Sequence, residues 1–401
     1  VQTCALPISR SEGAGDDGGG AGEFFAGGED VGGEAGVAET GEINGARFRV
    51  DIPENWNGGL VVWIHGYRPA GLPPRLPGDP VEQGQGVISP GESFTGIALG
   101  LGYAVAQSAF RVQGFALREG AEDSEALRQY FKRKYGRTYP TIVAGNHMGG
   151  LITYDVIEGF PDSYDGALPM GGTAEPRLEL MKSRMFDLRL LFDHFLPGLP
   201  GSAVEFPSSL THAGIMARAK ELMKQKPEET KLLLRIFGIG NEEGLARTLA
   251  TYTLILREVY DRAKGNPFDN RNTYYKGSGD DLKLNREIAR YQADRAAVEY
   301  ARQLPAPGGR IAKPVLALNP HGDPVVPIES THYYDTATQR AGASHLFVQT
   351  WVEANGASYK PEEMRRALEL LAEWIKHGKR PTPGELKINE QASRGSQGKA
   401  K

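Results

Sequence analysis

The 401-residue sequence predicts an α/β protein built on a mostly parallel sheet. Short apolar runs typical of buried strands alternate with segments of helical periodicity, and short loops join them. A long helix-rich stretch, residues 173–310, interrupts this alternation directly after a strand. We therefore expect the stretch to leave the sheet at the edge formed by the carboxyl ends of the strands, where ligands bind in open α/β sheets.

The strands are predicted from alternating or continuous apolar residues. The alternation INGARFRVDI and the runs LVVWI, TIVA and PVLAL are the clearest examples. The predicted strands are residues 43–52, 60–64, 103–108, 141–144, 166–170, 314–318 and 346–352.

Helices are predicted where apolar residues recur every three or four positions, as Leu127, Tyr130 and Phe131 do. Among the strands these segments are residues 92–101, 119–135, 151–160 and 361–377. In the helix-rich stretch they are residues 176–195, 213–237, 241–264 and 283–303.

The two ends of the chain are predicted to lie outside the core. Residues 11–42 carry nine acidic side chains, no basic side chain and twelve glycines, so we interpret residues 1–42 as a disordered acidic linker. Its first residues, VQTCALPI, resemble a translated sequencing adapter, and the chain does not begin with Met. We expect a metagenomic fragment whose native N-terminus is missing. The polar residues 384–401 are predicted to form a disordered tail.

Composition excludes several classes of protein. The formal net charge of −4 argues against a generally basic nucleic-acid binder. No apolar run approaches the roughly 20 residues that a membrane span needs. A single cysteine, Cys4, excludes disulfides within the chain and cysteine-based metal sites. No phosphate-binding glycine loop is present, and we predict no cofactor.

Three motifs follow predicted strands in a set order: HGY at residues 65–67, GNHMG at residues 145–149 and HGDP at residues 321–324. In this order they resemble the α/β-hydrolase family, specifically its secreted bacterial esterase and peptidase-like members, over roughly residues 43–383. The resemblance implies an eight-stranded type of sheet with helices on both faces. It also implies a core at 43–172 and 311–383, a helical lid at 173–310, and a secreted or periplasmic location.

The second motif corresponds to the nucleophile elbow of this family, G-x-S-x-G. Gly145, Gly149 and Gly150 fit the sharp turn, because larger side chains there would collide with neighbouring elements. His147, however, stands where the family has its serine, and residues 145–150 hold no Ser, Cys or Asp to replace it.

The rest of the triad is also altered. Asp323 matches the position of the family's carboxylate. Aligning Gly356 with the glycine of the family's Gly-His loop puts Ala357 where the histidine belongs. We therefore expect the imidazole of His147 to extend into the space that Ala357 vacates and to reach Asp323.

An imidazole oriented by a carboxylate can take a proton from water or attack an activated acyl group itself. In this family the oxyanion hole is made of backbone N–H groups, which correspond here to Tyr67 and Met148. Side-chain exchange at the elbow leaves such donors in place.

Two further histidines are candidates for the pocket. His65 corresponds to a residue that shapes the backbone in this family, and we interpret it as structural. His65, His147 and His321 could meet at the sheet edge, but loop histidines without matched spacing seldom chelate a metal, so we predict no metal site.

The leading hypothesis is an esterase-like hydrolase of a small or medium acyl ester that uses His147 with Asp323. The first alternative is a homologue that has lost catalysis and binds an apolar ligand under the lid. The second is a lyase or isomerase with His147 as its base. The partner in each case is a small molecule, and the sequence indicates no oligomeric state.

Overall fold

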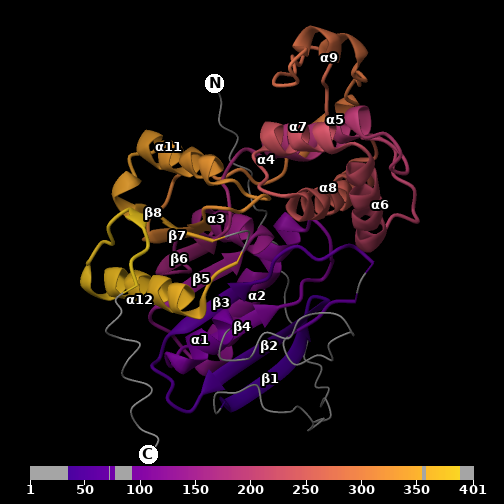
Figure 1. The fold of residues 1–401 in the computed structure, drawn as a ribbon. Helices are drawn as coiled ribbons and strands as arrows, with labels where there is room; N and C mark the ends of the chain where they lie inside the picture. Colours follow the sequence, from indigo (N-terminus) through magenta and orange to yellow (C-terminus); the bar gives the residue numbers. More distant parts are fainter. Residues whose placement is uncertain (1–34, 72, 77–92, 355–357, 389–401) are drawn as a thin grey trace, which may run out of the picture.

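The computed structural model describes residues 35–71, 73–76, 93–354 and 358–388 (Figure 1). Nine strands in these ranges form one sheet in the order β1-β2-β4-β3-β5-β6-β7-β8-β9. Their bounds are β1 Ala35–Ile43, β2 Ala46–Pro53, β3 Leu60–Ile64, β4 Ala104–Ser108, β5 Thr141–Asn146, β6 Gly166–Met170, β7 Val315–Pro320, β8 Phe347–Val352 and β9 Gly384–Glu385. Strands β1 and β2 are antiparallel to their neighbours, and the other pairs are parallel. The predicted mostly parallel α/β sheet is therefore confirmed.

Helices cover both faces of this sheet (Figure 1). One face carries α1 (Phe94–Gly100) and α12 (Pro361–His377), and the other carries α2 (Leu117–Tyr135), α3 (Met148–Gly159) and α11 (His332–Arg340). Alternate residues of β3 show why both faces need cover. Val61 packs with α1 and α12, whereas Leu60 and Val62 pack on the side of α2 and α3.

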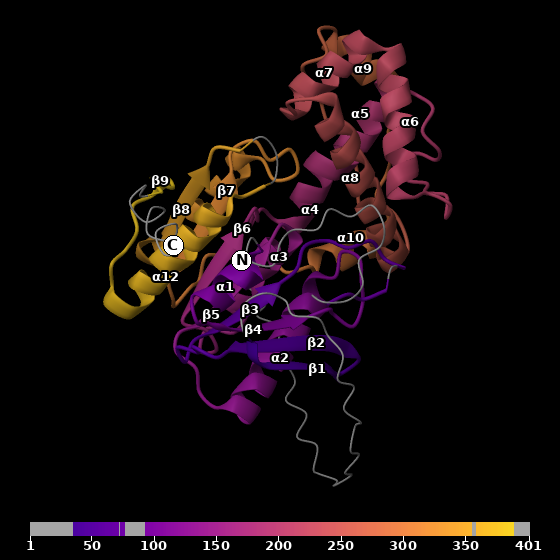
Figure 2. The ribbon, with the colours of Figure 1, turned by 60° about the horizontal axis from the view of Figure 1, so that its bottom comes forward.

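Between β6 and β7 the chain forms a separate set of helices, which stands at one end of the sheet and projects away from it (Figure 2). Its elements are α4 (Arg177–Leu180), the π-helical η2 (Met181–Phe186), α5 (Asp187–Phe195), α6 (His212–Gln225), α7 (Pro227–Phe237), α8 (Glu242–Ala263), α9 (Asp281–Glu287) and α10 (Arg295–Arg302). Two short 3-10 helices, η3 (Ile328–Thr331) and η4 (Ser344–Leu346), flank α11.

Two helices predicted as continuous in this segment are interrupted. The predicted helix 213–237 breaks at Lys226, which ends α6 and precedes Pro227, because a residue before proline disfavours helical backbone. The predicted helix 283–303 is split into α9 and α10. The chain between α9 and α10 is irregular. Asn266 and Asn270 form hydrogen bonds with its backbone, at Gln292, Ala289 and Tyr291.

Both predicted disordered ends reach too far into the chain. The sequence predicts a linker that includes residues 35–42, but these residues belong to β1, which pairs with β2 along its length. Glu39 accepts hydrogen bonds from Tyr130, Lys134 and Tyr135 of α2. At the other end, Gly384–Glu385 forms β9, and the Leu386 N–H donates to the Trp351 carbonyl oxygen at 2.7 Å.

No helix within the described ranges is long and apolar enough to cross a membrane. Residues 1–34 and 389–401, which carry the rest of the predicted linker and tail, lie outside those ranges.

The pairing of β1 yields a test by truncation. A chain beginning at Ala35 should keep the melting temperature of the full chain, because the acidic, glycine-rich residues before it are predicted to bury no core. A chain beginning at Ile43 loses the β1–β2 ladder and the contacts of Glu39, and should melt at least about 4 °C lower. Differential scanning calorimetry of both truncations makes the comparison. Equal melting temperatures would show that β1 contributes nothing to stability.

Candidate active site

The candidate site is built on the turn between β5 and α3. β5 ends at Asn146, α3 begins at Met148, and His147 between them has φ 53° and ψ −113°. This backbone conformation is strained for a residue with a side chain. The His147 N–H donates to the Met170 carbonyl oxygen at 2.9 Å, and its carbonyl oxygen accepts the Leu151 N–H at 3.0 Å. The two bonds fix the backbone of the turn.

Backbone atoms fill the space around the elbow glycines. A Cβ atom on Gly149 would lie 2.0 Å from the Ile64 carbonyl oxygen, and one on Gly145 would lie 2.4 Å from the Gly149 carbonyl oxygen. A Cβ atom on Gly150 would lie 2.6 Å from the Met170 carbonyl oxygen. Glycine is needed at all three positions because α3 packs directly on the ends of β3 and β6.

Asp323 lies in the turn after β7 and is close to the elbow. Its Oδ2 is 3.8 Å from Nδ1 of His147, with the His147 side chain 24% exposed and the Asp323 side chain fully buried. This separation is longer than a hydrogen bond, which spans about 2.7–3.2 Å. At this distance His147 still acts on the buried carboxyl and lowers the pKa of Asp323.

The two oxygens of Asp323 have different surroundings. Oδ1 accepts the N–H groups of Val325 and Val326 at 2.8 and 3.2 Å. Oδ2, which faces His147, has no hydrogen-bond partner among the described residues. Burial raises the pKa of Asp323 above its usual value, and the nearby His147 and the two backbone N–H groups partly offset this rise. The carboxylate is thus held in position while one of its oxygens remains available.

The loop that carries Tyr67 lies beside the elbow. A Cβ atom on Gly66 would be 3.2 Å from the Asn146 carbonyl oxygen and 3.8 Å from Cβ of His147. Met148 opens α3, where the first backbone N–H groups of a helix have no partner within the helix. The two backbone segments proposed for the oxyanion hole therefore flank His147.

The two other candidate histidines are placed differently. His65 stacks on Phe110 with ring centroids 4.0 Å apart, and its Nδ1 is 2.7 Å from the Gly66 carbonyl oxygen. Burial lowers the pKa of His65 to about 4, so it is a neutral, packed imidazole at pH 7. His321 is exposed, and its backbone N–H donates to the Val352 carbonyl oxygen. The described residues include no cluster of histidines, cysteines and acids that could hold a metal ion.

Ala357 lies outside the described residues, so its predicted place beside the imidazole stays a prediction. The same loop supplies Tyr359, a residue that the sequence did not single out. Its hydroxyl donates to the Leu318 carbonyl oxygen at 3.1 Å, and burial, together with the charge of Asp323, raises its pKa well above the usual value. Tyr359 is the one tyrosine in that loop, but the sequence alone does not indicate the direction of its side chain.

Glu258 of α8 is a second residue that the sequence did not indicate. Its buried carboxylate accepts the Tyr67 hydroxyl at 2.8 Å and the N–H groups of Ala70 and Phe115 at 2.8 and 2.9 Å. In the same helix, the Tyr252 hydroxyl donates to the Val325 carbonyl oxygen at 2.6 Å. Helix α8 therefore contacts the loops of both Tyr67 and Asp323, at the edge of the sheet that holds the elbow.

Comparison with known proteins gives similarity of structure and not of sequence. No protein-family profile matches the sequence, and no curated protein sequence matches it. Feruloyl esterase B from Aspergillus oryzae is 12% identical, with a TM-score of 0.47, over 85% of this chain and 80% of that chain. An esterase/lipase from an uncultured bacterium is 12% identical, with a TM-score of 0.41, over 84% of this chain and 85% of that chain. An acylaminoacyl peptidase from Pyrococcus horikoshii is 9% identical, with a TM-score of 0.43, over 86% of this chain and 42% of that chain.

At these identities the similarity concerns only the fold of the backbone. The strand order, the antiparallel β2 and the strand–turn–helix unit at His147 are those of the α/β-hydrolase fold, as the sequence predicts. The chemistry of the site has to come from the side chains of this chain.

The strained backbone at His147 gives a test of the elbow that needs no substrate. Glycine adopts a positive φ without penalty, so His147→Gly should be more stable than His147→Ala by about 1 kcal/mol, after the larger loss of entropy that glycine suffers on folding. Both variants remove the imidazole, so their difference reports only the backbone. Urea unfolding of the pair measures it. A His147→Ala variant as stable as His147→Gly would mean that the turn is not strained.

Proposed function

We propose that this protein hydrolyses small or medium acyl esters, with His147 as the general base and Asp323 as the group that orients it. The observation that carries this proposal is the buried oxygen of Asp323, which faces the elbow imidazole at 3.8 Å and has no hydrogen-bond partner among the described residues. A carboxylate in this position favours a proton on Nδ1, which leaves Nε2 as the basic nitrogen.

The proposed reaction has two steps. In the first step, Nε2 of His147 takes a proton from a water molecule while the oxygen of that water attacks the ester carbonyl carbon. The backbone N–H groups of Met148 and Tyr67 stabilise the negative charge that develops on the carbonyl oxygen. The tetrahedral intermediate then expels the alcohol, which receives the proton from the imidazolium. Asp323 stabilises the imidazolium between the two steps.

General-base catalysis is preferred over direct attack by the imidazole. An acyl-imidazole forms readily only from esters with good leaving groups. A base acting through water imposes no such limit, although it gives up the covalent intermediate that makes serine hydrolases fast. Burst kinetics with a nitrophenyl ester would indicate the covalent route instead.

The helical segment 173–310 is proposed to act as a lid over this site. The contacts of Glu258 with the Tyr67 loop and of Tyr252 with the Asp323 loop support this role, because they hold α8 next to both sides of the elbow. Such a segment can shape the acyl pocket and exclude water from it.

Hydrolysis of 4-nitrophenyl acetate tests the proposal. The unaltered chain should exceed the buffer rate, and His147→Ala should lower the enzymatic rate by about 100-fold or more. Asp323→Asn should also lower it, because the imidazole then loses its orienting charge. His377→Ala is the matched control: it removes an exposed imidazole at the end of α12 and should leave the rate unchanged. If His147→Ala keeps the full rate, His147 is not the base.

The pH profile reports on the carboxyl. The proposed reaction needs ionised Asp323, and burial raises the pKa of this group, so the rate should fall on the acid side as Asp323 takes up a proton. Asp323→Asn should remove this step from the profile. His147→Ser should stay slow, because no base replaces the imidazole. Serine-like rates from that single change would refute the assignment of Ala357 as the vacated histidine position.

A further inference from the structure

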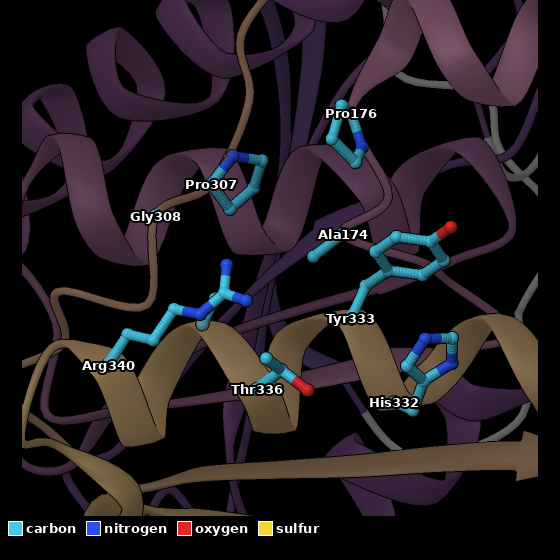
Figure 3. A pocket seen from close by; sticks show the side chains of 9 residues that line it. Ala174, Pro176, Pro307, Gly308, His332, Tyr333, Thr336 and Arg340 are labelled. Carbon is cyan, nitrogen blue, oxygen red and sulfur yellow. The ribbon is translucent and has the colours of Figure 1, made fainter.

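A cavity of about 400 Å³ lies on the side of α11 that faces the helical segment. Figure 3 shows Tyr333, Thr336 and Arg340 extending from α11, with Pro176 and Pro307 opposite them and Ala174 between. This volume is in the range of small-molecule sites, about 300–1,000 Å³. None of the lining residues belongs to the proposed active site.

The cavity is formed where the chain passes between the core and the helical segment. Ala174 and Pro176 lie on the outgoing connection after β6, and Pro307 and Gly308 lie on the returning connection before β7. Glu158 of α3 holds the returning connection by accepting the N–H groups of Gly308 and Gly309 at 2.8 and 2.7 Å. It also accepts the Tyr334 hydroxyl of α11 at 2.8 Å. These three hydrogen bonds of Glu158 join the walls of the cavity to α3.

The lining combines an apolar surface with the guanidinium of Arg340 and the imidazole of His332. Pro176, Pro307, Ala174 and the ring of Tyr333 provide flat apolar walls. The side chain of Arg340 is exposed and has no hydrogen bond or ion pair with any described residue, and no acidic residue lines the cavity. Three acids lie near the lining without belonging to it. Glu158 accepts hydrogen bonds from three donors. Glu175, which is buried, interacts with Arg184 and His332, and both Glu175 and Glu179 act on Tyr333.

We infer that this cavity is a second binding site for a small monocarboxylate with a flat apolar body, such as an aromatic acid. The carboxylate would pair with Arg340, whose planar guanidinium matches the geometry of a carboxylate, while the ring would lie between the prolines and Tyr333. A dication would meet no acid in the lining, and a polyphosphate would meet one arginine, one histidine and an otherwise apolar wall. A ligand in this position would contact both connections of the helical segment at once.

Titration calorimetry with 2-naphthoate and its neutral isostere 2-naphthamide tests this site. Naphthoate should bind with a submillimolar dissociation constant, and naphthamide should bind roughly 5-fold more weakly, because it lacks the charge that Arg340 recognises. Arg340→Gln should abolish the difference between the two ligands. Arg286→Gln, the same change at an exposed arginine of α9, should preserve it. Equal binding of naphthoate to Arg340→Gln and to the unaltered chain would overturn the proposal.

Two further variants locate the ligand. Thr336→Trp places a large ring in the cavity from a half-buried position on α11 and should abolish binding of both ligands, while binding to His147→Ala should be unchanged. Loss of naphthoate binding in His147→Ala would place the ligand at the elbow and refute a second site. If Thr336→Trp does not fold, protection of the Pro307 connection from hydrogen exchange by naphthoate decides the question. The absence of such protection would count against the site.

Discussion

The contact between Gly149 and the end of β3 is the constraint on which the rest of the site depends. With a Cβ position only 2.0 Å from the Ile64 carbonyl oxygen, α3 can start where it does only if its second residue has no side chain. That close approach goes with a sharp turn and with the positive φ of His147. The turn after β7, two strands away in the sheet, brings Asp323 to 3.8 Å from the imidazole.

The histidine changes what the turn can do. A serine hydroxyl needs a separate base before it can react, whereas an imidazole is itself a base near neutral pH. Asp323 keeps the two backbone hydrogen bonds that hold its Oδ1, and it presents its buried Oδ2 to the imidazole. The site therefore combines a held carboxylate with an elbow imidazole, and the proposed hydrolysis by activated water rests on this combination.

Local patterns predicted the sheet and the elbow well, because buried strands and closely spaced glycines carry their information within a few residues. The strands β3, β5, β6 and β8 and the turn at His147 fall where the apolar runs and the glycines place them. β1 was missed because its sequence, AGVAETGEI, is rich in glycine and acids and becomes a strand only by pairing with β2 and with tyrosines of α2. The contacts of Glu258 and Tyr359 could not be predicted from local sequence either, because each residue bonds to a partner more than 40 residues away.

The elbow contacts have a consequence for the evolution of such proteins. Every tight approach at the turn involves backbone atoms and glycines, and the His147 backbone is held by hydrogen bonds that any residue can make. Apart from the penalty that the positive φ imposes on every residue with a side chain, the scaffold places little demand on the chemistry of the group at this position. One reactive group at the elbow can therefore be exchanged for another while the strands and α3 keep their positions. New chemistry at this site then requires changes among the residues that surround the elbow side chain, such as those of the turn after β7 and of the loop before α12.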